Sequence, residues 1–176
     1  QTVLLPENPN IPGYSIAAKM IPTDSVGGDY YDVINVDGYF WIVIGDVSGH
    51  GISAGLIMMM AQTSIHTVLY QNPGISPKDL LTIINRTITN NITKLGESNY
   101  MTITVIAYMH DNNLIFSGLH LPLLIYRSKT NKVEMIDTQG MWIGILQDIN
   151  DVNQVSSFSL DSNDSLLLYT DGIVEA

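Results

Sequence analysis

The stretch Gly45-Asp46-Val47-Ser48-Gly49-His50-Gly51 is the strongest signal in this sequence for its fold and its functional site. It lies between the most apolar run of the sequence, residues 40–44, and a helical pattern that begins near Ser53. A buried strand therefore ends in a turn with three glycines, and glycine permits left-handed backbone and close approach. The pattern predicts that Asp46 is presented at a sharply bent strand end, where a carboxylate can serve a functional site.

Two more aspartates occupy similar Gly/Asp turns beside other predicted strands. They are Asp29, in Gly27-Gly28-Asp29, and Asp171, in Tyr169-Thr170-Asp171-Gly172. The pair Asp37-Gly38 is typical of a type I′ hairpin turn joining strands 30–36 and 39–45. Asp29 and Asp46 flank the outer ends of these strands, so antiparallel pairing makes them neighbours. Three aspartates in similar settings predict one shared site.

Aspartate oxygens are ligands that suit Mg²⁺ or Mn²⁺. Two such ions about 4 Å apart can activate a water for attack on phosphorus. Asp46, at the end of the most apolar strand, is the best candidate to bridge them. A single Gly-Asp turn is more often merely a turn. Three together, two of them joined by hairpin geometry, favour the metal site.

Composition excludes several other classes of protein. The 176 residues include seventeen acidic and seven basic side chains, for a net charge of −10. This argues against binding to nucleic acid or to an anionic membrane surface, because such binding depends on basic contacts. The absence of cysteine excludes thiol nucleophiles and disulfides. Without a signal peptide or an apolar run of membrane-spanning length, we expect no membrane insertion and a cytoplasmic location.

The sequence predicts one α+β domain over residues 1–176, of which residues 1–13 form an extended lead-in. Helices are predicted at 53–70 and from an N-cap at Ser76, followed by Pro77, to Gly96. The missing βαβ alternation favours antiparallel sheets. Strands are predicted at 14–20, 30–36, 39–45, 100–110, 114–118, 123–127, 133–136, 155–160 and 165–169.

Three motifs together resemble those of the PPM/PP2C-type serine/threonine phosphatases, in the bacterial RsbU and SpoIIE branch. They are Gly27-Gly28-Asp29-Tyr30-Tyr31-Asp32, the stretch 45–51 with Ala54 following, and residues 169–176. The match runs in order from about residue 11 to the end. The resemblance implies an α-β-β-α sandwich of two antiparallel sheets flanked by helices, with two Mn²⁺ or Mg²⁺ ions at one end.

The same resemblance implies roles for particular residues. Asp46 is the bridging ligand, Val47 contributes its backbone carbonyl, and Asp29 and Asp171 are carboxylate ligands. His50 lies beside them and either positions water or phosphate or is a polar turn residue. The implied substrate is a phosphoserine or phosphothreonine protein, typically an anti-sigma-factor antagonist, and the implied full-length protein has an upstream sensor or coiled-coil region.

Two departures from the family pattern leave alternatives open. The segment Gly118-Leu119-His120-Leu121-Pro122 has leucine where a second small residue is usual, and His120 is more often structural at such a turn. The sequence stops at Ala176, before the family's last helix and strand with another metal ligand, so one metal site is expected to be incomplete. The alternatives are a catalytically impaired, partner-binding pseudophosphatase and a hydrolase of small phosphoesters, and a homodimer stays open. Arg127 and Lys129 are expected to form an exposed surface pair rather than a phosphate guide.

Overall fold

The computed structural model describes residues 4–6, 9–21, 26–108 and 113–173, which form two antiparallel sheets and two long helices. One sheet has the strand order β1-β2-β3-β4-β7 and the other has β6-β5-β8. The α+β class with antiparallel sheets is therefore confirmed. The strands are β1 (Tyr30–Val36), β2 (Tyr39–Val47), β3 (Met101–Tyr108), β4 (Asn113–Leu119), β5 (Leu123–Arg127), β6 (Lys132–Ile136), β7 (Ser156–Ser159) and β8 (Ser165–Leu167).

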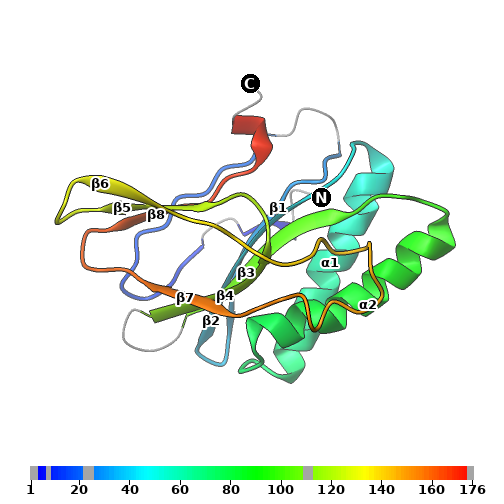
Figure 1. The fold of residues 1–176 in the computed structure, drawn as a ribbon, viewed down its shortest axis with the longest axis horizontal. Coiled ribbons are helices and arrows are strands. Elements are labelled where there is room, and N and C mark those ends of the chain that lie inside the picture. Colours follow the sequence, from blue (N-terminus) through cyan, green and yellow to red (C-terminus); the bar gives the residue numbers. More distant parts are fainter. Residues whose placement is uncertain (1–3, 7–8, 22–25, 109–112, 174–176) are drawn as a thin grey trace.

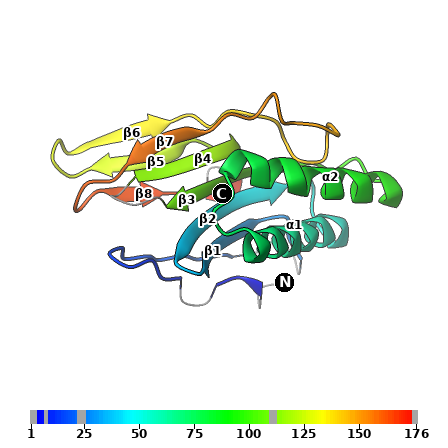
Figure 2. The same cartoon turned by 90° about the horizontal axis from the view of Figure 1, so that it is seen from below.

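Both long helices pack on the five-stranded sheet. Helix α1 (Ile52–Gln71) contacts β1 and β2, and helix α2 (Pro77–Leu95) contacts β3 and β4. Figures 1 and 2 show α1 and α2 side by side at one end of the molecule, with β5, β6 and β8 extending at the other. The described residues thus contain one helix layer and both sheet layers of the expected α-β-β-α sandwich.

The core has two compartments, one on each face of the five-stranded sheet. Strand β3 contributes to both, since Ile103 and Val105 pack toward the helices and Ile106 packs toward the second sheet. This double coverage explains why β3 is buried at nearly every position rather than at alternate ones. The second compartment consists of Ile106, Leu114, Phe116, Leu123, Ile125, Phe158 and Leu160.

The predicted turn and cap signals are confirmed. Asp37 and Gly38 both have positive φ, at 51° and 86°, as a type I′ hairpin requires. The Ser76 side chain accepts a hydrogen bond from the Asp79 backbone N–H, and Gly96 ends α2 in the left-handed conformation. Local chemistry therefore fixed the hairpin register and both ends of α2.

The strand predicted at residues 14–20 is wrong. The chain turns at residues 12–13, where the Tyr14 N–H bonds to the Ile11 carbonyl at 3.0 Å, and it then continues without strand pairing. Ala17, Ala18 and Lys19 are exposed, so the segment lacks the buried alternate row that would hold it in a sheet. The turn predicted to start at Asp111 lies outside the described residues.

Helix α1 is long and apolar enough to cross a membrane by length and composition alone, which is weak evidence because core helices pass the same test. Its apolar stripe packs on β1, β2 and α2. The buried residues are Ala54, Gly55, Ile57, Met58, Ala61, Ile65 and Leu69. Core packing therefore accounts for the apolar character of α1.

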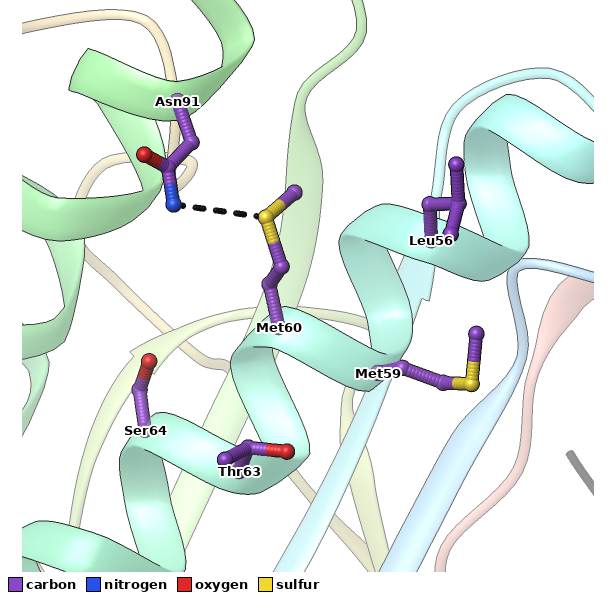
Figure 3. A pocket seen from close by; sticks show the side chains of 6 residues that line it. All are labelled: Leu56, Met59, Met60, Thr63, Ser64 and Asn91. Atoms are coloured by element: carbon purple, nitrogen blue, oxygen red, sulfur yellow. Dashed lines mark hydrogen bonds between the residues drawn. The ribbon is translucent and has the colours of Figure 1, made fainter.

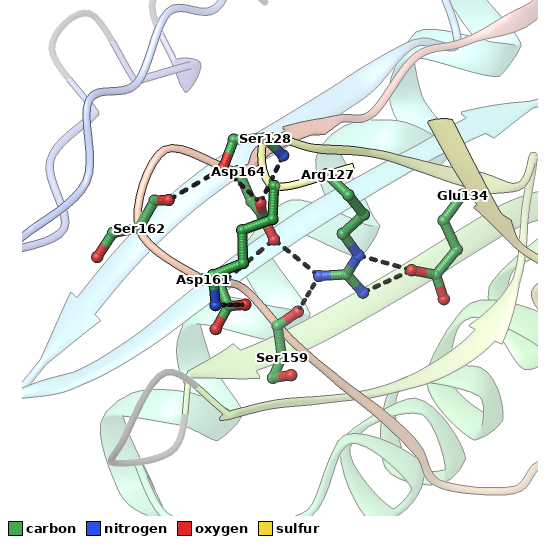
Figure 4. A network of polar contacts seen from close by, with 8 residues as sticks. Arg127, Ser128, Glu134, Ser159, Asp161, Ser162 and Asp164 are labelled. Carbon is green, nitrogen blue, oxygen red and sulfur yellow. Dashed lines mark hydrogen bonds and ion pairs between the residues drawn. The ribbon is translucent and has the colours of Figure 1, made fainter. Parts of the chain in front are cut away.

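Arg127 joins β5 to three other segments (Figure 4). Its guanidinium contacts Glu134 on β6 at 2.6 Å and Asp164, before β8, at 2.9 Å, and it donates to the Ser159 carbonyl on β7. Lys129 pairs with Asp161 at 2.8 Å. Lys129 therefore makes the exposed surface pair expected for it. Arg127 is instead half-buried, pairs with the buried side chain of Asp164 and links the two sheets through Ser159.

Candidate metal centre

The hairpin brings Asp29 and Asp46 together, as the sequence predicted. Tyr30 lies opposite Gly45 in the antiparallel register, and the Val47 N–H donates to the Gly28 carbonyl at 3.2 Å. Pairing therefore continues past both aspartates, which are half-buried neighbours at the same end of the sheet. The predicted adjacency of residues 29 and 46 in the hairpin is thus confirmed for the backbone.

Gly28 is buried and packs directly against two candidate oxygen ligands. A β-carbon at this position would lie 2.4 Å from the Val47 carbonyl oxygen and 2.9 Å from Asp46 Oδ1. Any larger residue there would collide with these oxygens and displace them. Glycine is thus required by close approach, and it allows a carboxylate and a carbonyl oxygen, of the kind that Mg²⁺ and Mn²⁺ bind, to lie beside the same strand end.

The turn after β2 is anchored by its neighbour at the start of β3. The Ser48 N–H donates to the Tyr100 carbonyl at 2.8 Å, and the Tyr100 N–H donates to Ser48 Oγ at 2.9 Å. The Asn99 side chain donates to the Ser48 carbonyl. With positive φ at Gly49 and Gly51, this pairing bends the chain sharply into α1, as the three glycines predicted.

Asp171 reaches the same end of the molecule from the other sheet. It begins the short 3₁₀ helix η2 (Asp171–Ile173), which follows β8, and it is exposed. Two residues earlier, the Tyr169 carbonyl accepts a hydrogen bond from His120 Nε2 at 2.9 Å. Burial lowers the pKa of His120, while the negative charges of Asp171 and Asp29 oppose that shift. Carboxylates from both sheets therefore act on one imidazole.

His50 and Val47 occupy different environments. His50 is exposed in the turn between β2 and α1, whereas Val47 is buried and its carbonyl oxygen faces Gly28. Position alone does not give His50 a role, so the function predicted for it stays a prediction.

The residues fit a hard divalent cation by donor chemistry, since a carboxylate and a carbonyl oxygen both lie beside Gly28. Their side chains do not by themselves form a complete ligand set. No three His, Asp or Glu side chains within residues 4–6, 9–21, 26–108 and 113–173 are close enough together to hold a metal ion. The metal roles predicted for Asp29, Asp46, Val47 and Asp171 therefore stay predictions.

Sequence reasoning gave too little weight to His120 and missed Thr102. Thr102 Oγ1 lies 2.8 Å from His120 Nδ1 and 3.2 Å from the Asp46 carbonyl oxygen. The sequence signal for these residues was the segment 118–122. In the structure, Gly118 has φ of +108° and lies so close to β3 that a β-carbon would sit 2.2 Å from the Ile103 carbonyl oxygen. Close packing is thus provided by Gly118, while Leu119 is half-buried.

An open surface groove of about 300 Å³, separate from these residues, lies between the helices (Figure 3). It is lined by Leu56, Met59, Met60, Thr63, Ser64 and Asn91. Asn91 Nδ2 on α2 donates to the Met60 sulfur on α1 at 3.3 Å, while Met58 is fully buried. The three consecutive methionines therefore serve helix packing, as expected.

Sequence comparison connects this arrangement to a known family. Residues 36–176 match the model of Stage II sporulation protein E (SpoIIE). The chain is 29% identical over 177 residues to the phosphoserine phosphatase RsbU of Bacillus subtilis, covering 99% of this chain and 51% of that protein. It is 28% identical over 193 residues to protein IcfG of Synechocystis, covering 96% of this chain and 30% of that protein.

Solved structures show the same fold at low identity. The SiaA-PP2C domain of Pseudomonas aeruginosa has a TM-score of 0.70 and 21% identity, covering 86% of this chain and 58% of that one. The PP2C phosphatase domain of Bacillus subtilis SpoIIE has a TM-score of 0.63 and 22% identity, covering 86% and 43%. The PP2C-like fold is thereby confirmed. The chain spans about half the length of RsbU, and the activity, substrate and partners of the whole protein are therefore proposals.

Proposed function

Because this chain belongs to the SpoIIE family, we propose that it is a metal-dependent protein serine/threonine phosphatase domain. Its substrate would be phosphoserine or phosphothreonine on a regulatory protein of the anti-sigma-factor-antagonist type. The name of the relative RsbU, a phosphoserine phosphatase, supports this reaction class. A cytoplasmic location, an upstream sensor or coiled-coil region and a homodimer remain predictions that accompany it.

One observation carries the proposal. Asp29 and Asp46 are neighbours at one strand end, and Gly28 allows Asp46 Oδ1 and the Val47 carbonyl oxygen to approach that end closely. A structural hairpin requires neither two neighbouring carboxylates nor a close-packed glycine at its open end. Half-buried carboxylates beside a carbonyl oxygen suit a hard divalent cation.

The candidate residues would have separate roles in holding the metal ions and orienting the reacting groups. The carboxylates of Asp29, Asp46 and Asp171 and the carbonyl of Val47 would hold two Mn²⁺ or Mg²⁺ ions, with Asp46 shared between them. Such ions supply an activated water and neutralise charge on the phosphoryl group. His50, at the exposed turn, would orient that water or the phosphate. The chain has no cysteine, so no thiol takes part as a nucleophile.

Substrate class follows from charge and exposure. A domain of net charge −10 attracts nucleic acid poorly, so a phosphorylated protein or peptide is the favoured substrate. Protein loops can approach an exposed centre such as that around His50 and Asp171. Rates on phosphoserine and phosphothreonine peptides, nucleotides and small phosphoesters would rank the substrates.

The direct test is Mn²⁺-dependent hydrolysis of p-nitrophenyl phosphate and of a phosphoserine peptide by the wild-type chain and by Asp46→Asn. We expect Asp46→Asn to lower the rate by more than about 100-fold, the upper end of the effect of outer-shell partners of a metal. Asp37→Asn is the matched control, because it makes the same chemical change at the other end of the same hairpin, where asparagine tolerates the positive φ.

Equal rates for folded wild-type and Asp46→Asn protein would overturn the proposal. A wild-type chain that binds no Mn²⁺, yet is folded by circular dichroism, would instead indicate the pseudophosphatase alternative. Faster hydrolysis of nucleotides or sugar phosphates than of phosphopeptides would indicate the small-phosphoester alternative.

A further inference from the structure

The imidazole of His120 is hydrogen-bonded at both nitrogens to segments that carry candidate metal ligands. Nδ1 lies 2.8 Å from Thr102 Oγ1, which is 3.2 Å from the Asp46 carbonyl oxygen. Nε2 lies 2.9 Å from the Tyr169 carbonyl oxygen, two residues before Asp171. The ring therefore spans the distance between the end of β2 in one sheet and the segment after β8 in the other.

The backbone of His120 is held as firmly as its ring. Its N–H donates to Thr138 Oγ1 at 3.0 Å, and the Thr138 hydroxyl donates back to the His120 carbonyl. Thr138 is buried, and next to it Gln139 forms a bridge with Gly118. With both its backbone and its ring fixed, His120 acts as a rigid spacer.

The direction of one ring bond follows from chemistry. A carbonyl oxygen only accepts, so Nε2 carries the hydrogen and donates it to Tyr169. Removing that donor leaves the Tyr169 carbonyl without this partner. Residues 168–170 lie outside the strand ladder of β8, so the bond to His120 is a direct tie between the Asp171 segment and the five-stranded sheet.

We propose that His120 is a positioning residue of the metal centre, which sets the place of Asp171 relative to Asp46 through its bonds to Tyr169 and Thr102. This inference rests on the proposed function, because it assumes that the two aspartates share a metal pair. Outer partners of this kind commonly change metal affinity by about 10- to 100-fold when removed.

Two substitutions of His120 test the hydrogen bonds of its two ring nitrogens separately. The amide nitrogen of asparagine can take the place of Nδ1, whereas that of glutamine reaches the place of Nε2. His120→Asn should therefore lose the bond to Tyr169, and His120→Gln should keep it. We expect His120→Asn to weaken Mn²⁺ binding by about 10- to 100-fold, and His120→Gln, which keeps the Tyr169 bond but loses the Thr102 bond, to weaken it clearly less than His120→Asn does. Titration calorimetry and the paramagnetic resonance of free Mn²⁺ measure this without reference to activity.

A double variant tests the route through Asp171. If His120 acts by placing Asp171, then His120→Asn combined with Asp171→Asn should bind Mn²⁺ no more than about 3-fold more weakly than Asp171→Asn alone, because the two changes share one effect. Fully additive losses would overturn the proposal, and so would equal Mn²⁺ affinity in His120→Asn and wild type.

The failures of the two proposals are distinguishable. A wild-type chain that binds no Mn²⁺ overturns the proposed function and the positioning role with it. If Asp171→Asn weakens binding and His120→Asn does not, only the positioning role is overturned.

Should His120→Asn fail to fold, Thr102→Val and Thr102→Ser probe the other end of the link. Valine should weaken Mn²⁺ binding while serine preserves it, and equal binding by this pair would contradict the proposal.

Discussion

Gly28 lies so close to Asp46 that a β-carbon on the glycine would sit 2.9 Å from Asp46 Oδ1. The same atom would be 2.4 Å from the Val47 carbonyl oxygen, which is backbone and cannot swing away. The glycine therefore protects two candidate ligands at once. A β-carbon on its sequence neighbour Gly27 would instead meet no heavy atom of the described residues within 4 Å.

This contrast predicts different outcomes for two alanine substitutions. Gly28→Ala should destabilise the fold by about 1–3 kcal/mol through overpacking and weaken Mn²⁺ binding at least about 10-fold. Gly27→Ala should change Mn²⁺ affinity by less than about 3-fold, since its β-carbon meets open space. Denaturant unfolding and Mn²⁺ titration measure both effects. Similar behaviour of the two variants would contradict the role assigned to the close contacts of Gly28.

Asp32 anchors α1 to β1 through a buried hydrogen-bond group. Its carboxylate, 4% exposed, accepts from the Tyr30 hydroxyl at 3.0 Å and lies 2.8 Å from His66 Nε2. Burial and the nearby Asp32 charge raise the pKa of Tyr30 well above its usual value, so the phenol remains a donor. His66→Ala should lower the free energy of unfolding by about 1–3 kcal/mol, because a buried acceptor loses a partner.

The control for His66→Ala is Thr63→Ala, an exposed position on the same helix. Its effect should stay within about 0.5 kcal/mol. Chemical denaturation at pH 7 gives both values. A negligible cost for His66→Ala would show that solvent replaces the histidine at Asp32.

The cap of α2 gives a prediction independent of the site. Ser76 Oγ accepts from the Asp79 N–H at 3.1 Å. Ser76→Ala should reduce stability by about 1 kcal/mol, and Ser76→Thr, which keeps the hydroxyl, should cost only a few tenths. Thermal unfolding of the two variants tests this, and equal losses would exclude the side-chain cap as the cause.

The Arg127 pair predicts a pH dependence of stability. Donation from the Arg127 guanidinium, helped by the Ser128 N–H, lowers the pKa of Asp164 to about 2. A lowered folded pKa stabilises the fold above the unfolded value, near 3.9, and this contribution is lost as the pH falls through about 2. Asp164→Asn should therefore be less stable than wild type at pH 7, by a difference that shrinks between about pH 4 and pH 2.

Denaturant unfolding at pH 7, 4 and 2.5 measures that difference. Asp161→Asn serves as the comparison, because its pair with Lys129 is solvent-exposed and should contribute little at any pH. A wild-type advantage over Asp164→Asn that is constant with pH would contradict the role assigned to the ion pair.

The predictable part of the site was the part encoded locally. Asp37-Gly38 set a hairpin register, and that register alone made Asp29 and Asp46 neighbours. The strand predicted at residues 14–20 failed for the converse reason. Short apolar segments become strands only if a partner edge is available, and the sequence holds no local signal for the presence of that edge.

The sequence by itself determined the hairpin, the α2 cap, the glycine turn after β2 and the family motifs, because each depends on residues within a few positions of one another. The tertiary structure decided that His120 and Thr102 lie between Asp46 and the Tyr169–Asp171 segment, which are more than a hundred residues apart in the chain. Such contacts arise from the stacking of two sheets, in which distant side chains meet across a shared core. Gly45–Gly51 therefore identifies one half of the candidate centre, and the packing of the sheets supplies the other.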